Sequence, residues 1–267
     1  MNHLNRELAP IADNAWTQIE AEANRSLQHY LAARRLIDFE GPLGWDHSSI
    51  DLGRVKNLAG SPAGTETARR TVQPMLELRA PFSVSRTELA AAERGATDLD
   101  LDTVIAASTS AAVAEDTIIF HGHESAGIRG IVESSPHGAI PISDDYSEYP
   151  EHVAKAVATL RGADVAGPYA IALGARCYTG VVETTEHGGY PVFDHLRQIL
   201  GGPVVWAPAV EGAVVLSQRG GDFVMTVGQD FSIGYQTSDT AAVGLYLEES
   251  FTFQIVTPGA AVHLAYT

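Results

Sequence analysis

The sequence predicts an α+β fold built around one unusually long strand. From Val243 to Ile255, apolar and polar residues alternate over thirteen positions, which is the period of a strand with two different faces. At roughly 3.3 Å per residue this strand spans about 40 Å, whereas strands usually have about five or six residues. Helical periodicity over 13–33 and 99–120, and a helix–strand alternation over 133–218, complete the prediction. A sheet this long must reach beyond a compact single domain.

Composition limits the function. The chain has 267 residues with 17 basic and 33 acidic side chains, a net charge of −16. Such a balance argues against nucleic acid as the main partner, because phosphate contacts need a basic face. The single Cys177 favours a reducing compartment. We see neither an apolar signal core near the first residues nor an apolar run of the roughly 20 residues that cross a membrane, and expect a soluble cytoplasmic protein.

The first helix is amphipathic. Trp16, Ile19, Ala23 and Leu27 recur at spacings of three and four residues, which predicts a helix over roughly 13–33 with one apolar stripe. Pro10 leads into it, Asp13 is a candidate N-cap, and Arg34 and Arg35 suit its negative end. No neighbouring segment offers a partner, so the stripe must pack on a distant part of the chain. A short extended piece over 36–39 and a turn over 40–45 follow.

A polar hairpin comes next. Strands are predicted over 52–58 and 67–78, joined by the flexible tip 59–64. Charged side chains lie along the arms and the tip: Arg54, Lys56, Glu66, Arg69 and Arg70. A hairpin this polar buries little by itself and is marginal alone. It is either a mobile flap or a hairpin completed by another subunit, and the arginines favour the second interpretation.

The remaining elements follow in order. Ser85 and Glu88 have the spacing of a capping box, so a helix is expected over 85–94, ended by Gly95, before the alanine-rich helix over 99–120. In the α/β lobe we expect helices over 149–161, 176–183 and 191–200 and strands over 168–173, 204–206 and 213–217. Two short strands, over 223–227 and 231–235, precede the long one.

No catalytic set is identifiable. His121-Gly122-His123-Glu124 contains metal-ligand residue types, but a helix end with solvated polar residues explains it without a metal. Cys177 has His187 and His195 within reach in sequence, yet a small buried residue explains it as well. The glycine pairs form no phosphate-binding motif. Glu249 interrupts the apolar face of the long strand, so we expect it to meet an arginine. An enzyme is the less favoured alternative.

Short motifs in a fixed order along the chain carry a resemblance. The most specific is Arg219-Gly220-Gly221-Asp222-Phe223, followed by Gly228-Gln229-Asp230 and Ser232-Ile233-Gly234-Tyr235. Others are Leu8-Ala9-Pro10 with Ala15-Trp16, Gly41-Pro42, Glu93-Arg94-Gly95, Glu115-Asp116, Gly167-Pro168-Tyr169 and Gly189-Tyr190-Pro191. Together they resemble the encapsulin shell proteins, whose fold is that of the tailed-phage major capsid protein.

This resemblance implies a phage major capsid-like fold with a peripheral domain, an extended loop and an inserted axial α/β domain. The boundaries expected from it are 1–48 for the inner-face helix and the start of the peripheral domain, 49–80 for the extended loop, 81–132 for the peripheral domain with the long helix, 133–218 for the axial domain, and 219–267 for the closing sheet of the peripheral domain.

The resemblance also implies a function. About 60 copies would assemble into an icosahedral compartment (closed symmetry in the general sense) that encloses a cargo enzyme, a dye-decolourising peroxidase or a ferritin-like iron oxidase. The cargo's C-terminal targeting peptide would dock in an inner groove. The groove residues implied by position are Leu27, Tyr30, Leu31, Arg34, Asp38, Phe231 and Ile233.

Two further expectations follow from it. A loop around the five-fold pore would comprise Thr184, Thr185, Glu186, His187, Gly188 and Gly189, with Glu186 and His187 making the opening cation-favouring and pH-sensitive. Some members carry a flavin beside a tryptophan, but the corresponding position here is Thr87, so neither a flavin nor another cofactor nor a metal is expected. The alternative within the same fold is a prophage capsid protein that packages DNA.

Overall fold

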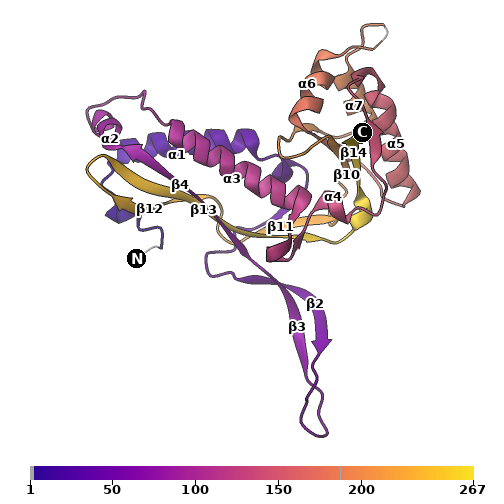
Figure 1. The fold of residues 1–267 in the computed structure, drawn as a ribbon, viewed down its shortest axis with the longest axis horizontal. Coiled ribbons are helices and arrows are strands. Elements are labelled where there is room, and N and C mark those ends of the chain that lie inside the picture. The colour runs from indigo at the N-terminus through magenta and orange to yellow at the C-terminus, as the bar shows by residue number, and fades with distance from the viewer. Residues whose placement is uncertain (1–2, 187) are drawn as a thin grey trace.

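A five-stranded sheet carries the larger part of the chain. The structure is a computed structural model that describes residues 3–186 and 188–267. The strand order is β1 (Asp38–Glu40), β11 (Phe223–Val227), β13 (Ala242–Ile255) and β12 (Ser232–Ser238), and β4 (Leu76–Ser85) pairs with the opposite side of β13. β13 pairs with β12 through its first half and with β11 through its second half. The long late strand is therefore confirmed, and it is the shared element of this sheet (Figure 1).

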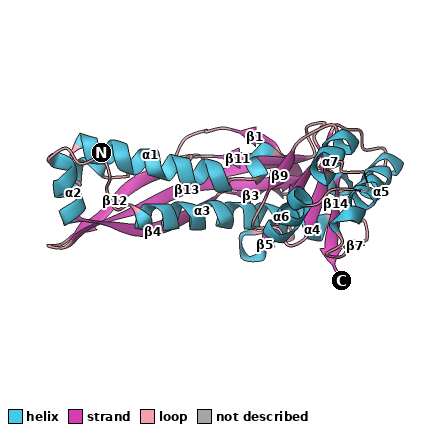
Figure 2. Cartoon of the chain, turned by 90° about the horizontal axis from the view of Figure 1, so that it is seen from above, coloured by secondary structure: helices cyan, strands magenta, loops and turns pink. Residues whose placement is uncertain are grey.

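Two helices lie side by side on one face of this sheet (Figures 1 and 2). They are α1 (Asp13–Tyr30) and α3 (Asp102–His121), with the short α2 (Arg86–Glu93) at one end. Ile19 and Leu27 of α1 pack in one buried cluster with Leu245 of β13 and Ile233 of β12. The expectation that the first helix packs on a distant segment is confirmed.

Helix starts differ in detail from the sequence expectations. Asp13 is the first residue of α1, and Ala12 occupies the N-cap position. Ser85 does cap α2, accepting a hydrogen bond from the Thr87 amide at 3.1 Å. Glu88 does not close a capping box, because its carboxylate accepts instead from the Asp100 amide at 3.0 Å. It thus joins α2 to the segment before α3.

Helix α3 corrects one expectation. It is the one helix in the described part of the chain that is long and apolar enough to cross a membrane by length and composition, although the sequence analysis found no such run. More than half of its apolar window is buried inside the fold. Val104, Ala111 and Ala112 face the sheet and α1, while Phe120 at its end enters the second core. The composition of α3 therefore reflects its place between two cores.

Strand β4 differs from the sequence expectation, which extended the hairpin arm to residue 78 and placed the next helix over 85–94. Pro81 weakens the strand pattern there, because proline is rare inside strands. In the structure the hairpin consists of β2 (Ser49–Asn57) and β3 (Ala68–Pro74), and β4 follows after a single residue. Pro81 stands opposite Tyr246, in register with β13. The hairpin is thus a continuation of a body strand and projects away from the body (Figure 1).

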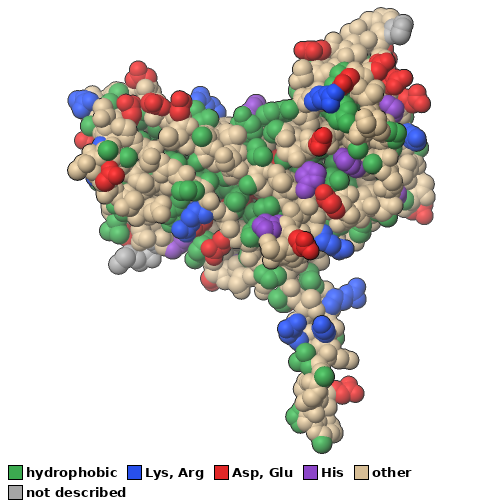
Figure 3. Space-filling model, in the orientation of Figure 1, with side chains coloured by type: hydrophobic (Ala, Val, Ile, Leu, Met, Phe, Trp, Pro, Cys, Tyr) green, Lys and Arg blue, Asp and Glu red, His purple; other side chains and the backbone are tan. Residues whose placement is uncertain are grey.

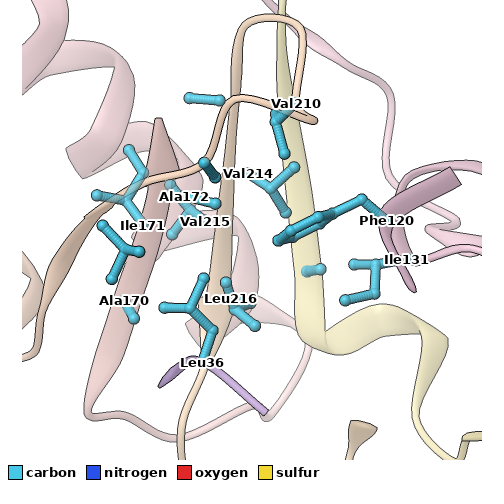
Figure 4. Packing of buried hydrophobic residues seen from close by; sticks show 14 of the residues in the cluster. Leu36, Phe120, Ile131, Ala170, Ile171, Ala172, Val210, Val214, Val215 and Leu216 are labelled. Carbon is cyan, nitrogen blue, oxygen red and sulfur yellow. The ribbon is translucent and has the colours of Figure 1, made fainter. Parts of the chain in front are cut away.

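The inserted lobe has its own sheet and core. Its strand order is β7 (Ile140–Ile142), β14 (Ala261–Tyr266), β10 (Ala213–Ser217), β8 (Tyr169–Leu173) and β9 (Val204–Trp206). The helices around it are α5 (Tyr149–Gly162), α6 (Ala175–Glu183) and α7 (Val192–Leu200). Figure 4 shows Phe120 and Ile131 directed at Val214 and Leu216 of β10. The core of the lobe is therefore continuous with the end of α3.

The final strand corrects a domain boundary. Residues 219–267 were all expected in the closing sheet, but β14 pairs with β10 and β7 of the lobe. The chain thus leaves the main sheet after β13 and returns to the lobe. Short elements complete the fold: β5 (Gly122–His123), β6 (Ile128–Arg129), α4 (Ile131–Ser134) and 3₁₀ turns at Arg6–Leu8, Ala33–Arg35, Glu124–Ala126, Tyr146–Glu148 and Pro258–Ala260.

Candidate functional site

A cavity of about 150 Å³ lies between α1 and β12. Its apolar walls come from Ala23 and Leu27 of α1 and from Phe231 and Ile233 of the β12 segment. These residues meet because the apolar stripe of α1 lies across residues that alternate along the strand. Phe231 is half-buried, whereas Ile233 is 4% exposed and belongs to the core. We call this cavity and its mouth the α1–β12 groove.

Residues 3–8 close one end of this groove. Leu4 is 7% exposed and lies on the groove wall, and its carbonyl accepts a 2.8 Å hydrogen bond from the Tyr235 amide. The Arg6 guanidinium pairs with Glu20 of α1 at 2.5 Å and stands 4.3 Å from the Trp16 ring centroid. His3 stacks on Trp45 with 4.0 Å between the ring centroids, and its Nε2 lies 3.2 Å from Oε1 of the buried Glu248. We call residues 3–8 the strap.

An arginine surrounded by carboxylates fixes the segment after α1. Arg34 reaches Glu115 of α3 with Nε–Oε1 at 2.9 Å and Asp230 with Nη1–Oδ1 at 2.8 Å, and it also pairs with Glu249 of β13. Glu115 and Glu249 are fully buried. The expectation that Glu249 meets an arginine is confirmed. One guanidinium therefore ties together α3, β13 and the loop before β12.

Burial and charge set the pKa values in this cluster. Burial alone lowers the pKa of Arg34, but the hydrogen bonds to Glu115 and the charges of Glu249 and Asp230 outweigh it, so the pKa lies above its ordinary value. Burial, together with the neighbouring charge of Glu115, raises the pKa of Glu249 well above the ordinary carboxyl range. Burial and a neighbouring like charge thus both disfavour the ionised form of Glu249.

A second buried carboxyl holds the end of α1. Asp116 accepts hydrogen bonds from the amides of Ala32 and Ala33, each at 2.9 Å. Burial raises the pKa of Asp116 to about 7, although the two amide hydrogen bonds lower it. The turn after α1 is thus fixed to α3 twice. Its backbone amides donate to Asp116, and its Arg34 side chain pairs with Glu115.

The structure brings together only part of the predicted groove set. Leu27, Phe231 and Ile233 line the α1–β12 groove, and Leu31 packs half-buried against the same apolar cluster. Tyr30 packs partly buried against that cluster as well, and its ring faces Trp206 of the lobe with 5.3 Å between the ring centroids. The guanidinium of Arg34 lies outside the groove lining but near the groove mouth, 5.2 Å from the Phe231 ring centroid.

Asp38 is not in the groove. Its Oδ2 accepts a 2.6 Å hydrogen bond from the Gly221 amide, and the residue lines a separate cavity of about 290 Å³ with Ser217 and Gly220. The expectation that Asp38 orients a peptide beside Leu27 is therefore wrong in position. Asp38 is the first residue of β1, which runs parallel to β11, and so its side chain fixes the turn that starts β11.

The predicted pore loop is a tight turn between α6 and α7. The Val192 amide donates to Thr184 O at 3.1 Å and the Glu186 amide to Tyr190 O at 2.8 Å. Glu186 turns its side chain back toward α7, with Oε1 2.7 Å from His195 Nδ1. Thr185, Gly188 and Gly189 are exposed, and His187 lies outside the described residues. The loop forms the outer tip of the lobe (Figure 3).

The hairpin is almost wholly exposed. Arg54, Lys56, Glu66, Arg69 and Arg70 are all exposed, and Figure 3 shows their charges along the arms. Apolar side chains are exposed as well: Val55 by 66%, Leu58 by 46% and Val72 by 41%. A two-stranded hairpin with exposed apolar side chains and free strand edges is a surface that another chain can cover.

The candidate catalytic residues have structural roles. His121 Nδ1 lies 3.0 Å from Glu133 Oε1, and His123 Nδ1 lies 3.0 Å from Ser125 Oγ. Across the described residues, no group of three or more His, Cys, Asp or Glu side chains is arranged to hold a metal ion. Cys177 is fully buried, with its Sγ 3.0 Å from the Tyr149 hydroxyl.

The sequence analysis missed several residues of the groove: Leu4, Arg6, Glu20, Asn24, Ser232 and Leu247. Leu4 and Arg6 precede Pro10, where the sequence offered no periodicity. Glu20 and Asn24 were detectable in principle, because they lie three or four residues from Ala23 and Leu27 on the predicted helix.

Comparisons with known proteins agree with this architecture. The family model described as "Encapsulating protein for peroxidase" matches residues 1–252. A type 1 encapsulin shell protein of Rhodospirillum rubrum is 50% identical over 270 residues, covering 99% of this chain and 96% of the relative. That of Brevibacterium linens is 43% identical (99% and 100% covered), and that of Mycobacterium tuberculosis is 40% identical (100% and 100% covered).

Solved structures support the fold. A virus-like particle from Pyrococcus furiosus superposes with a TM-score of 0.68 at 17% identity, covering 93% of this chain and 98% of that chain. The capsid of an empty GTA particle gives a TM-score of 0.53 at 14% identity, covering 89% and 90%. The α+β capsid-like fold is thus confirmed. With a family model over most of the residues and full-length relatives at 40–50% identity, the chain belongs to the encapsulin shell protein family.

Proposed function

We propose that this chain is the shell subunit of a closed icosahedral compartment of about 60 copies, the order of the icosahedral rotation group. The observation that carries the proposal is the β2–β3 hairpin, which projects from the body and buries almost none of its side chains. Burial of Val55, Leu58 and Val72 requires a second subunit, and the hairpin's strand edges suit pairing with a neighbour's hairpin.

The compartment, in this proposal, encloses a cargo enzyme in the cytoplasm. The family description "Encapsulating protein for peroxidase" supports a peroxidase; a ferritin-like iron oxidase is the other class that the sequence resemblance suggests. The cargo's C-terminal targeting peptide would bind at the α1–β12 groove, where Phe231 supplies an accessible apolar anchor. The pore loop, with Thr184–Gly189, would surround the five-fold opening for small molecules. The chain's own role is structural rather than catalytic.

Purification of the assembled protein tests the first part. We expect size-exclusion chromatography to give a closed particle and mass spectrometry to find an enzyme inside it. A monomer or dimer as the main species would refute the shell. Particles that contain nucleic acid without an enzyme would favour the phage capsid alternative, which the net charge of −16 disfavours.

The groove needs a variant that leaves the fold intact. An aspartate at Ile233 would destabilise the core, because Ile233 is 4% exposed. Phe231→Ala is better, since Phe231 is half-buried at the groove mouth. We expect assembled shells with at least tenfold less cargo. Gln236→Ala, an exposed position on β12 outside the cavity lining, is the matched control and should load normally. Unchanged loading in Phe231→Ala would remove the groove from the proposal.

A further inference from the structure

The strap is seated on the α1–β12 groove as a peptide ligand would be. It makes three kinds of contact there. Leu4 places an apolar side chain on the groove wall, Leu4 O accepts from the Tyr235 amide at 2.8 Å, and Arg6 pairs with Glu20 at 2.5 Å. Together these contacts combine an apolar anchor, a backbone hydrogen bond to a strand and a charge pair, which is the usual set for a peptide that binds beside a strand edge.

Strand β12 has a free edge at this point. Its inner side pairs with β13 through Ser232–Ser238. The Tyr235 amide points away from β13, because its partner is Leu4. Backbone groups alternate in direction along an antiparallel strand, so Ile233 presents its groups to the same outer edge. An extended segment can therefore add to β12 there, at the edge where the strap now takes the hydrogen bond of the Tyr235 amide.

The groove is small while the strap is in place. Its volume of about 150 Å³ is well below the roughly 300–1,000 Å³ typical of ligand pockets. Leu4 forms part of its wall, so displacing Leu4 enlarges it at once. The charged contact of the strap inside the groove is weak, because Arg6 and Glu20 are 35% and 42% exposed and their ion pair is screened by solvent. Outside the groove the strap is held by His3, which stacks on Trp45 and places its Nε2 3.2 Å from Glu248 Oε1.

We propose that the strap is a built-in competitor for the targeting peptide, which displaces it and takes over its contacts. This inference rests on the proposed cargo groove. It defines the chemistry of the partner: an extended segment with an apolar residue in the place of Leu4 and a basic residue two positions later that pairs with Glu20. Loading is then limited by the fraction of subunits whose strap is open, because apparent affinity falls with that fraction.

The strap's own sequence is the probe that tests this. A fluorescent passenger protein ending in residues 3–9 of this chain (His-Leu-Asn-Arg-Glu-Leu-Ala) is co-expressed with native shells and with a Leu4→Ser/Arg6→Ser variant. Passenger fluorescence per shell is then measured. We expect the variant to hold at least tenfold more passenger than native shells. A passenger whose tail has serine in place of the first leucine, the counterpart of Leu4, should stay outside native and variant shells alike.

Controls separate competition from damage. Glu7→Ser changes an exposed strap residue and should load like native shells. Size-exclusion chromatography checks that each variant assembles, and a single Arg6→Ser change serves if the double variant does not. As a second readout, hydrogen exchange at the Tyr235 amide should speed up in the strap variant and slow again when the passenger is bound.

Equal passenger loading in native and strap-variant shells would overturn the inference. Equal loading of passengers with and without the first leucine of the tail would overturn it as well. This outcome is distinct from failure of the cargo groove. If Phe231→Ala empties shells of their own cargo but the passenger is never taken up, the groove stands and the strap model falls. If the passenger is taken up while Phe231→Ala shells keep their cargo, the strap competes for a site that the cargo does not use.

Discussion

For the buried cluster around Arg34, we predict that replacing the arginine destabilises the fold much more than neutralising Glu249 does. Replacing Arg34 with methionine removes the cation that faces Glu115 and Glu249, both fully buried. Breaking a buried ion pair from one side costs about 3–5 kcal/mol, because the remaining charge is left uncompensated. At about 2–4 °C per kcal/mol for a chain of this size class, we expect the unfolding midpoint to fall by roughly 6–20 °C.

Glu249→Gln should lower the free energy of unfolding far less than Arg34→Met does. Burial and the charge of Glu115 raise the pKa of Glu249 well above the ordinary carboxyl range, so its ionised form is disfavoured and a glutamine keeps a neutral group of similar shape there. We expect a loss within about 1 kcal/mol, or a few degrees at most. The assay is thermal unfolding of assembled shells at one protein concentration, because assembly itself shifts the midpoint.

Arg25→Met is the matched control, since Arg25 pairs with Glu22 on the exposed face of α1 and should not change the midpoint. The double variant Arg34→Met/Glu249→Gln should recover part of the stability lost by Arg34→Met alone. If Glu249→Gln lowered the midpoint as much as Arg34→Met does, the charge of Glu249 would matter as much as that of Arg34, and the expected asymmetry would be refuted.

Three other predictions test different parts of the fold. The folded-state pKa of Asp116, about 7, lies above its ordinary value, so the stability that its protonated form adds to the fold is fully present below about pH 4 and is lost as pH rises through 7. The urea concentration at the unfolding midpoint should therefore be higher at pH 5.5 than at pH 8, and this difference should be smaller in Asp116→Asn. Cys177, fully buried, should react with iodoacetamide only in denaturant; labelling of native protein would contradict its place in the core. Deleting 186–189, at the exposed tip between α6 and α7, should change the rate at which cations enter the shell; an unchanged rate would exclude this loop as the pore.

Periodic segments were predictable from the sequence, and isolated ones were not. The apolar stripe of α1, the alanine-rich α3 and the alternation of β13 all gave correct elements, since each contains many residues of one period. β4 was missed because Pro81 weakens its pattern, and pairing with β13 outweighs that local preference. β14 was not predicted as a strand, and its residues were assigned to the closing sheet, because a strand's partners depend on where the chain returns rather than on its residues.

The same division applies to the candidate site: residues on periodic elements were predictable, and residues placed by single contacts were not. Leu27, Phe231 and Ile233 share a cavity because each belongs to a periodic element whose apolar face was identified. Asp38 was misplaced because its position depends on a hydrogen bond to the Gly221 amide, which no spacing rule predicts. The strap carried no periodic signal at all. Its Leu4 and Arg6 acquire roles only through contact with Tyr235 and Glu20 in the folded chain.

The distribution of fixed contacts along α1 indicates which part of the groove can move. At its C-terminal end, Asp116 holds the amides of Ala32 and Ala33, and Arg34 is buried among carboxylates. At its N-terminal end, Asn14 and Gln18 donate to the carbonyls of Ala92 and Ala96 beside α2. A helix fixed at both ends cannot swing away from β12 without losing one of these sets. Opening of the groove therefore has to come from the strap, whose contacts in the groove include one backbone hydrogen bond, one apolar side chain and one solvent-screened ion pair. His3, stacked on Trp45 and 3.2 Å from Glu248 Oε1, lies outside the groove lining and can keep the strap attached while Leu4 leaves.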